Sequence, residues 1–134
     1  GLGVTALKDP YLARMMAATC RPGDAFIAIS ATGRTREVIE AVQIARHYRA
    51  QAIAITTPGS DLAQAADVAL TVAVPEYPDT LKPTASRFAF LAVIDLLAAA
   101  TGYSMGAAAR ETMRRIKYAV QTHRQGAMLE PLGD

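Results

Sequence analysis

Continuous apolar runs alternate along the chain with segments of helical periodicity. Residues 25–29 and 52–56 are apolar without regular polar alternation and are bounded by turn residues. This pattern is typical of strands that are buried on both faces of a parallel sheet. Residues 68–72 form a third run of this kind, and residues 4–7 are a weaker candidate for a further strand. The pattern therefore predicts four strands at most.

Helical segments separate these runs. Residues 35–48 place Val38 and Val42 on one face and charged residues on the other, which indicates an amphipathic helix. Asp9 and Pro10 favour the start of an earlier helix, because aspartate caps helices and proline tolerates the first helical position. Further helices are predicted over three ranges: 61–65 with Ser60 as its cap, 85–101 with Gly102 past its end, and 107–124.

Strands that alternate with helices at this spacing predict the α/β class. We expect a three-layer, doubly wound, flavodoxin-like parallel sheet with helices on both faces. Four strands are few for such a domain, so either a strand lies elsewhere or the chain is a fragment.

Length and composition agree with one folded domain. The chain has 134 residues, of which 51% are hydrophobic, and its formal net charge is +2. These values exclude a disordered chain, and an excess of two positive charges gives no general phosphate-binding surface.

Other features narrow the class of protein further. A single cysteine, Cys20, excludes an internal disulfide and a cysteine-based zinc cluster, and no His/Asp/Glu cluster has metal-ligand spacing. No signal peptide is evident, and the apolar stretches are interrupted short of a membrane span. We therefore expect a cytoplasmic domain without membrane contact, metal or cofactor.

The richest loop for chemistry follows the strand predicted at 25–29. It contains the hydroxyl groups of Ser30, Thr32 and Thr35 together with Gly33 and Arg34. Unpaired N–H groups and the helix dipole favour an anion at the start of the next helix, and glycine permits close approach of the backbone. The alternative is an ordinary strand–helix turn with hydroxyl capping. Three hydroxyl groups around a glycine favour a phosphate site over that alternative.

These residues carry a family resemblance. Ser30, Thr32, Gly33 and Thr35 after an apolar strand resemble the Ser-x-Ser-Gly-x-Thr loop of sugar isomerase (SIS) phosphosugar-binding domains, with threonine in place of the usual middle serine. The resemblance covers about residues 1–125. Further segments that look like this family are 21–24, 34–38, 55–56, 66–67 and 83–87, and segments 95–97 and 115–117 look specifically like RpiR-type bacterial transcription regulators.

The resemblance implies a sensing domain. In RpiR-type regulators an N-terminal helix-turn-helix domain binds DNA, and the C-terminal SIS domain senses a phosphosugar and helps to dimerise. The family's first strand and its Gly-x-Gly-x-Ser loop are not evident here. We therefore expect residues 1–134 to be one SIS domain that begins inside the fold, with residues 4–7 as its second strand and without the DNA-binding domain.

Three more residues are candidates for the ligand site. Glu76 lies in a proline-rich loop after the third predicted strand, where SIS isomerases use a glutamate as a base; the alternative is a solvated loop carboxylate. Thr84 and Ser86 begin the next helix near the same sheet edge, and capping explains one of them without a ligand.

Two main functions compete. A sensing module would bind a sugar phosphate, whereas an aldose–ketose sugar-phosphate isomerase needs a positioned base and acid. Neither His47 nor His123 is placed for that work, so the sequence favours sensing, with no catalytic residues. A purely structural dimerisation domain is a third option. The helix predicted at 85–101 is apolar on more than one side, which predicts a homodimer or a higher homo-oligomer.

Overall fold

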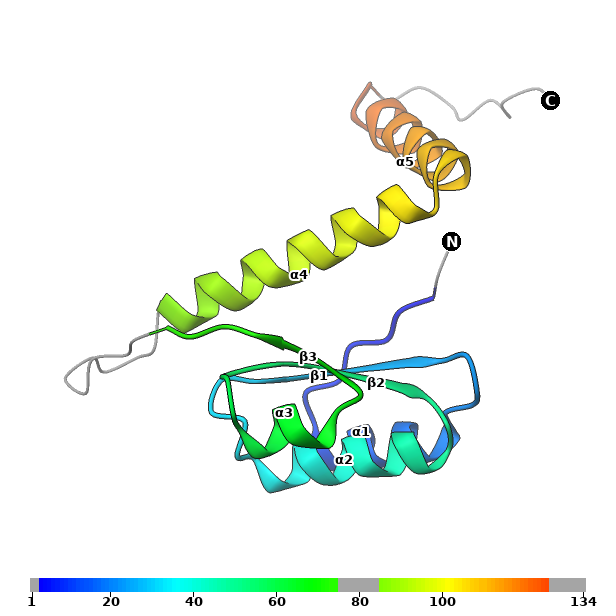
Figure 1. Ribbon diagram of the computed structural model, residues 1–134. Helices are drawn as coiled ribbons and strands as arrows, with labels where there is room; N and C mark the ends of the chain where they lie inside the picture. Colours follow the sequence, from blue (N-terminus) through cyan, green and yellow to red (C-terminus); the bar gives the residue numbers. More distant parts are fainter. Residues whose placement is uncertain (1–2, 75–84, 126–134) are drawn as a thin grey trace. The chain divides into compact units, whose positions relative to one another are not determined.

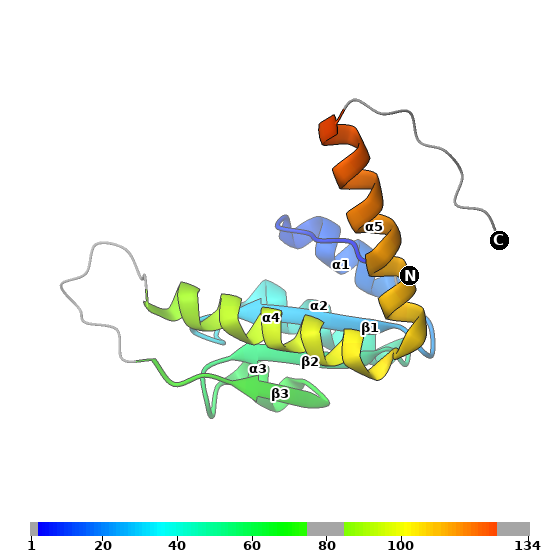
Figure 2. The same ribbon diagram turned by 90° about the horizontal axis from the view of Figure 1, so that it is seen from above.

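Three parallel strands form the sheet of the computed structural model, in the order β1-β2-β3 (Figure 1). β1 (Ala25–Ser30) pairs with β2 (Gln51–Thr56), and β2 pairs with β3 (Val68–Thr71). Seen from above, the strands lie side by side (Figure 2). The structure describes residues 3–74 and 85–125. The predicted α/β class with a parallel sheet is confirmed, and all three apolar runs are strands.

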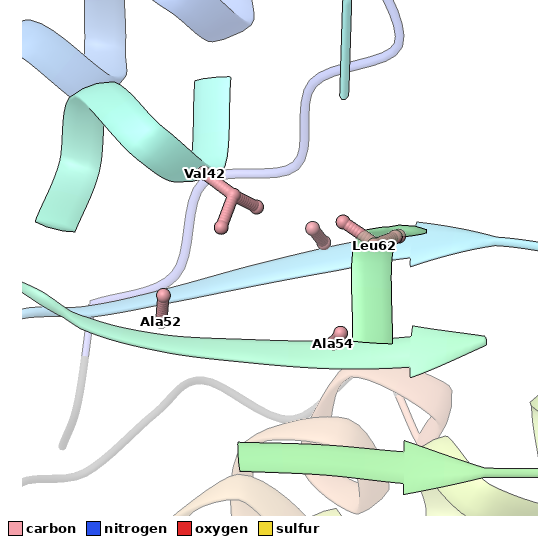
Figure 3. Packing of buried hydrophobic residues seen from close by; sticks show 5 residues of the cluster. Val42, Ala52, Ala54 and Leu62 are labelled. Carbon is pink, nitrogen blue, oxygen red and sulfur yellow. The ribbon is translucent and has the colours of Figure 1, made fainter. Parts of the chain in front are cut away.

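Three helices cover one face of this sheet. α1 (Pro10–Thr19) packs against α2 (Arg36–His47), α2 contacts β1 and β2, and α3 (Asp61–Ala65) contacts β2 and β3 (Figure 1). Small residues dominate the contact. Figure 3 shows Val42 and Leu62 directed towards Ala52 and Ala54 of β2, and all four side chains are buried.

The opposite face of β1 is only partly covered among the described residues. Successive side chains of a strand point to opposite faces. Ile27 and Ile29 therefore point away from α1–α3 and remain 47% and 45% exposed. The burial on both faces that the apolar run predicted for this strand is wrong for the described part of the chain.

The segment before α1 differs from its prediction. Residues 4–7 form no strand, and Val4 is 88% exposed. A short apolar segment needs a neighbouring strand for its backbone hydrogen bonds, and none of the described strands pairs with it. The helix start is confirmed, because the Asp9 carboxylate accepts a hydrogen bond from the Leu12 N–H at 2.9 Å. At the end of α1, burial and then the nearby Asp24 charge raise the pKa of the Cys20 thiol.

Two long helices follow the sheet. α4 (Ala85–Ser104) continues through Gly102, which was predicted to lie past its end, and Gly106 takes the left-handed turn before α5 (Ala107–Gln125). One glycine inside a helix costs only about 1 kcal/mol, which 20 residues of helix can absorb. The chain divides into two compact units, Val4–Asp95 and a unit that begins at Leu96.

α4 is also long and apolar enough, by length and composition alone, to cross a membrane. Arg87 and Asp95 interrupt its apolar stretches as expected, but the helix extends beyond its predicted end and so reaches the length of a span. Asp95 lies in the middle of this helix. A carboxylate at the centre of a bilayer costs about 2.5–3.5 kcal/mol, which favours a helix that belongs to a folded domain.

Candidate functional site

The 30–35 loop connects the carboxyl end of β1 to the start of α2, and the hydroxyl groups of Ser30 and Thr35 face one another. Ser30 is the last residue of β1 and is 9% exposed. Its Oγ accepts a hydrogen bond from the Gly33 N–H at 3.1 Å and lies 3.2 Å from Thr35 Oγ1. Gly33 has a φ of 61°, which lets the chain turn back between these two hydroxyls. The loop therefore closes on itself through Ser30.

The hydroxyl pair has one proton more than it uses internally. Each hydroxyl has a single proton, and only one of the two lies between Ser30 and Thr35. The other proton has no acceptor among the described residues. The Thr32 oxygen accepts from the Arg34 N–H at 3.3 Å, so its proton is also available. The loop can thus donate at least two hydroxyl hydrogen bonds to a ligand.

The first turn of α2 has no side-chain cap. Thr35 occupies the N-cap position with extended backbone angles, yet its side chain makes no capping hydrogen bond because it is directed to Ser30. Within the part of the chain that the structure describes, the N–H groups of Arg36 and Glu37 have no backbone acceptor. Unpaired N–H groups at the positive end of a helix dipole attract an anion.

A cleft of about 540 Å³ lies beside the loop. One wall contains Thr32 and Arg34, and the other is the turn after β2, which includes Ser60 and Asp61. Ser60 is predicted from the sequence as a helix cap, but not as part of the ligand site. The available signal was its position, because adjacent parallel strands bring their carboxyl ends to the same sheet edge.

A second hollow lies at the other end of the sheet, next to the start of β2. Arg46 and Asp67 are among the residues that line it, and the Arg46 guanidinium pairs with Asp67 at 2.8 Å and donates to the Ala65 carbonyl at 2.9 Å. Asp67 also accepts from the Ala52 N–H. These contacts connect α2 and the end of α3 to β2. They indicate that Arg46 and Asp67 have a structural role.

The predicted site residues fall into three groups. Ser30 contacts both Gly33 and Thr35, and Thr32 and Arg34 line the cleft. Ser86 is buried in the first turn of α4, and its place in the ligand site stays a prediction, while Glu76 and Thr84 lie outside the described residues. No group of three His, Cys, Asp or Glu side chains that could hold a metal ion occurs in residues 3–74 and 85–125.

Comparison with known families decides what kind of domain this is. The family model of the SIS domain matches residues 4–100. The chain belongs to the SIS domain family. The resemblance that the 30–35 loop carried is therefore confirmed at the level of the family.

Similar proteins include two bacterial regulators. The HTH-type transcriptional regulator HexR of Escherichia coli (strain K12) is 41% identical over 128 residues, which cover 94% of this chain and 44% of that protein. HexR of Pseudomonas aeruginosa PAO1 is 39% identical over 116 residues, which cover 87% of this chain and 41% of that protein. The chain spans less than half the length of these relatives.

The fold also matches a solved structure. The Vibrio vulnificus NanR protein complexed with ManNAc-6P superposes with a TM-score of 0.74 and 28% sequence identity, over 85% of this chain and 43% of that one. The flavodoxin-like layout predicted for this SIS chain is thereby confirmed.

Proposed function

We propose that this chain is the effector-sensing domain of an RpiR-type bacterial transcription regulator, and that it binds the phosphate group of a sugar phosphate at the 30–35 loop. The observation that carries the proposal is the uncapped first turn of α2 beside the Ser30–Thr35 hydroxyl pair. Similar proteins support it, because HexR bears the name of a transcriptional regulator and NanR was solved with ManNAc-6P.

The loop offers a phosphate three kinds of interaction. N–H groups in the first turn of α2 and the spare proton of the Ser30–Thr35 pair donate hydrogen bonds to its oxygens. Gly33, at a φ of 61°, lets the chain turn back between the two hydroxyls of that pair. Arg34 adds a positive charge at the cleft wall. Neutral donors fix the position of the phosphate, and the arginine raises its affinity.

The arrangement favours binding over isomerisation. An isomerase of aldose and ketose phosphates needs an acid and a base at the sugar carbons. His47 is the last residue of α2, roughly 16 Å along the helix from the phosphate end at 1.5 Å per residue. The relatives described above are named as regulators, which supports a domain that senses its ligand without converting it.

Titration calorimetry with hexose, pentose and amino-sugar phosphates tests this function. We expect at least one sugar phosphate to bind and its unphosphorylated parent sugar not to bind, and no aldose–ketose conversion above background. Equal affinity for a sugar and its phosphate would contradict the proposed site. Aldose–ketose conversion by the wild type that disappears in Glu76→Gln would mean that the domain is an enzyme and not a sensor.

We also propose that the SIS domain self-associates and works in the cytoplasm, without membrane contact. Phe88, Leu91 and Leu96 of α4 are each more than half exposed, and a soluble monomer seldom leaves such a patch open. DNA binding would reside in a separate helix-turn-helix domain of the regulator. Sedimentation equilibrium at micromolar concentration tests the assembly, and a 14.2 kDa monomer would refute it.

A further inference from the structure

The turn between β2 and α3 packs directly against the 30–35 loop. The Gly33 carbonyl accepts a hydrogen bond from the Leu62 N–H at 3.0 Å. A Cβ atom on Gly33 would overlap the side chain of Ser60 and crowd the hydroxyl of Thr56. Thr56 is fully buried and Ser60 is 7% exposed. The backbone of the loop therefore rests on two buried hydroxyl side chains of the next βα unit.

The direction of the hydrogen bond between Thr56 and Ser60 follows from the number of hydroxyl protons. Ser60 donates its only hydroxyl proton to the Thr57 carbonyl at 2.9 Å and accepts from the Ala63 N–H at 3.3 Å. Its Oγ lies 3.2 Å from Thr56 Oγ1. Since the Ser60 proton is already used, Thr56 must be the donor of that bond. Both side chains are thus held in one orientation.

We propose that Thr56 and Ser60 are positioning residues for the phosphate site. Their hydrogen bond fixes the surface on which Gly33 rests, and the Gly33 N–H in turn holds the Ser30 hydroxyl beside Thr35. Neither residue needs to touch the phosphate. A binding group is held accurately when the residues around it are themselves locked by packing and hydrogen bonds. The inference rests on the proposed function, since it describes how that same site keeps its shape.

Isosteric variants of Thr56 test this role. Thr56→Val keeps the shape and removes the donated proton, whereas Thr56→Ser keeps the proton. With inorganic phosphate as the probe, we expect Thr56→Val to weaken binding about tenfold, as for the loss of one buried hydrogen bond, and Thr56→Ser to stay within about twofold. Ser60→Ala is a second variant with the same expected direction.

Asp9→Ala provides a matched control. It removes the N-cap of α1, as Ser60→Ala removes that of α3, but Asp9 has no contact with the loop among its hydrogen bonds. Asp9→Ala should lower thermal stability and leave phosphate affinity unchanged. If it weakens phosphate binding as much as Thr56→Val does, general destabilisation explains both results and the positioning role is wrong.

Hydrogen exchange supplies a readout that needs no ligand. The amides of Gly33 and Leu62 are both hydrogen-bonded within this contact. We expect Thr56→Val to speed their exchange about tenfold and Asp9→Ala to leave it unchanged.

The two proposals fail differently. If phosphate does not bind the wild type, or binds equally well to Thr35→Val, the phosphate site is wrong and the positioning role falls with it. A second outcome is that Thr35→Val weakens phosphate binding, whereas Thr56→Val and Thr56→Ser have the same phosphate affinity and the same rates of amide exchange. In that case only the positioning role is overturned.

Discussion

The first turns of α2 and α3 follow neighbouring parallel strands, and each begins with a hydroxyl residue in the N-cap position. Thr35 and Ser60 have similar extended backbone angles there, with φ of −69° and −75°. Ser60 uses its oxygen to accept the Ala63 N–H, so the start of α3 is capped from within the chain. Thr35 turns instead to Ser30 and leaves α2 uncapped.

This is the difference expected between a helix start with a structural role and the proposed binding one. Loss of an N-cap costs a helix roughly 1 kcal/mol, so the uncapped turn of α2 lowers the stability of the free protein. Violations of a local rule concentrate at functional sites, where a ligand completes what the chain leaves open. The turn of α3 is capped from within the chain and contacts the neighbouring loop through the hydrogen bond from the Leu62 N–H to the Gly33 carbonyl.

The largest effect is expected at the contact between the two turns. Gly33→Ala forces an alanine into the left-handed region, which costs about 1–2 kcal/mol, and drives its Cβ into Ser60, which adds about 1–3 kcal/mol of overpacking. We expect the free energy of unfolding to fall by about 3 kcal/mol and phosphate binding to be lost.

Gly59→Ala is the control for that substitution, because Gly59 also has positive φ but a Cβ added there would meet no atom within 4 Å. Chemical denaturation should show only the backbone cost of about 1–2 kcal/mol, without the overpacking. Equal losses in the two variants would mean that the contact with Ser60 is unimportant.

Thr35→Asp converts the open turn of α2 into a capped one. Aspartate is a strong N-cap residue, so thermal unfolding should show a gain of about 1 kcal/mol in stability without ligand. The same carboxylate would repel a phosphate and compete for the helix N–H groups, which should weaken phosphate binding by about a hundredfold or more. A variant that is both more stable and fully able to bind would disprove the contrast between the turns.

Thr35→Val should have a smaller effect on binding. It removes one hydroxyl of the Ser30–Thr35 pair while preserving shape, so calorimetry should show a loss of about 1–3 kcal/mol in binding free energy. Because Thr35 does not cap α2, stability without ligand should change by less than about 0.5 kcal/mol. Thr112→Val, at an exposed threonine of α5, is the control and should bind as the wild type does.

Local signals were sufficient to predict most of this architecture. The apolar runs predicted all three strands, and the Asp9–Pro10 pair predicted the start of α1. Ser60 was predicted as a cap from its position before a short helix, and its hydrogen bond to the Ala63 N–H confirms it. These features depend on residues close together in the sequence, where turn chemistry and periodicity are informative.

Features that depend on distant neighbours were not predictable in the same way. The apolar character of residues 4–7 is that of a strand, but a strand also requires a partner, which no local pattern specifies. The apolar run that contains Ile27 and Ile29 is typical of a strand buried on both faces. Whether both faces of the sheet are covered depends on the packing of distant segments. Likewise, the sequence shows that the 30–35 loop contains hydroxyl residues. That the Thr35 side chain contacts Ser30 instead of capping α2 depends on the folded conformation of the loop.

The smallest expected effect concerns the charges on the cleft walls. Arg34 lies on the wall formed by the 30–35 loop, and Asp61 lies on the opposite wall. Exposed charges are screened by solvent, so Arg34→Gln should weaken phosphate binding by only about twofold to fivefold at low salt. Asp61→Asn should strengthen it by a similar factor, because it removes a negative charge from the same cleft.

Salt dependence separates these charge effects from the hydrogen bonds of the α2 turn. Calorimetric titrations at about 0.05 M and 1 M salt compare Debye lengths of roughly 14 Å and 3 Å, so the effects of Arg34→Gln and Asp61→Asn should largely vanish at high salt. The effect of Thr35→Val should persist, because a neutral hydroxyl in direct contact with the ligand is not screened. If the loss in Arg34→Gln persists at 1 M salt, the guanidinium contacts the phosphate directly, and charge as well as the uncapped turn defines the site.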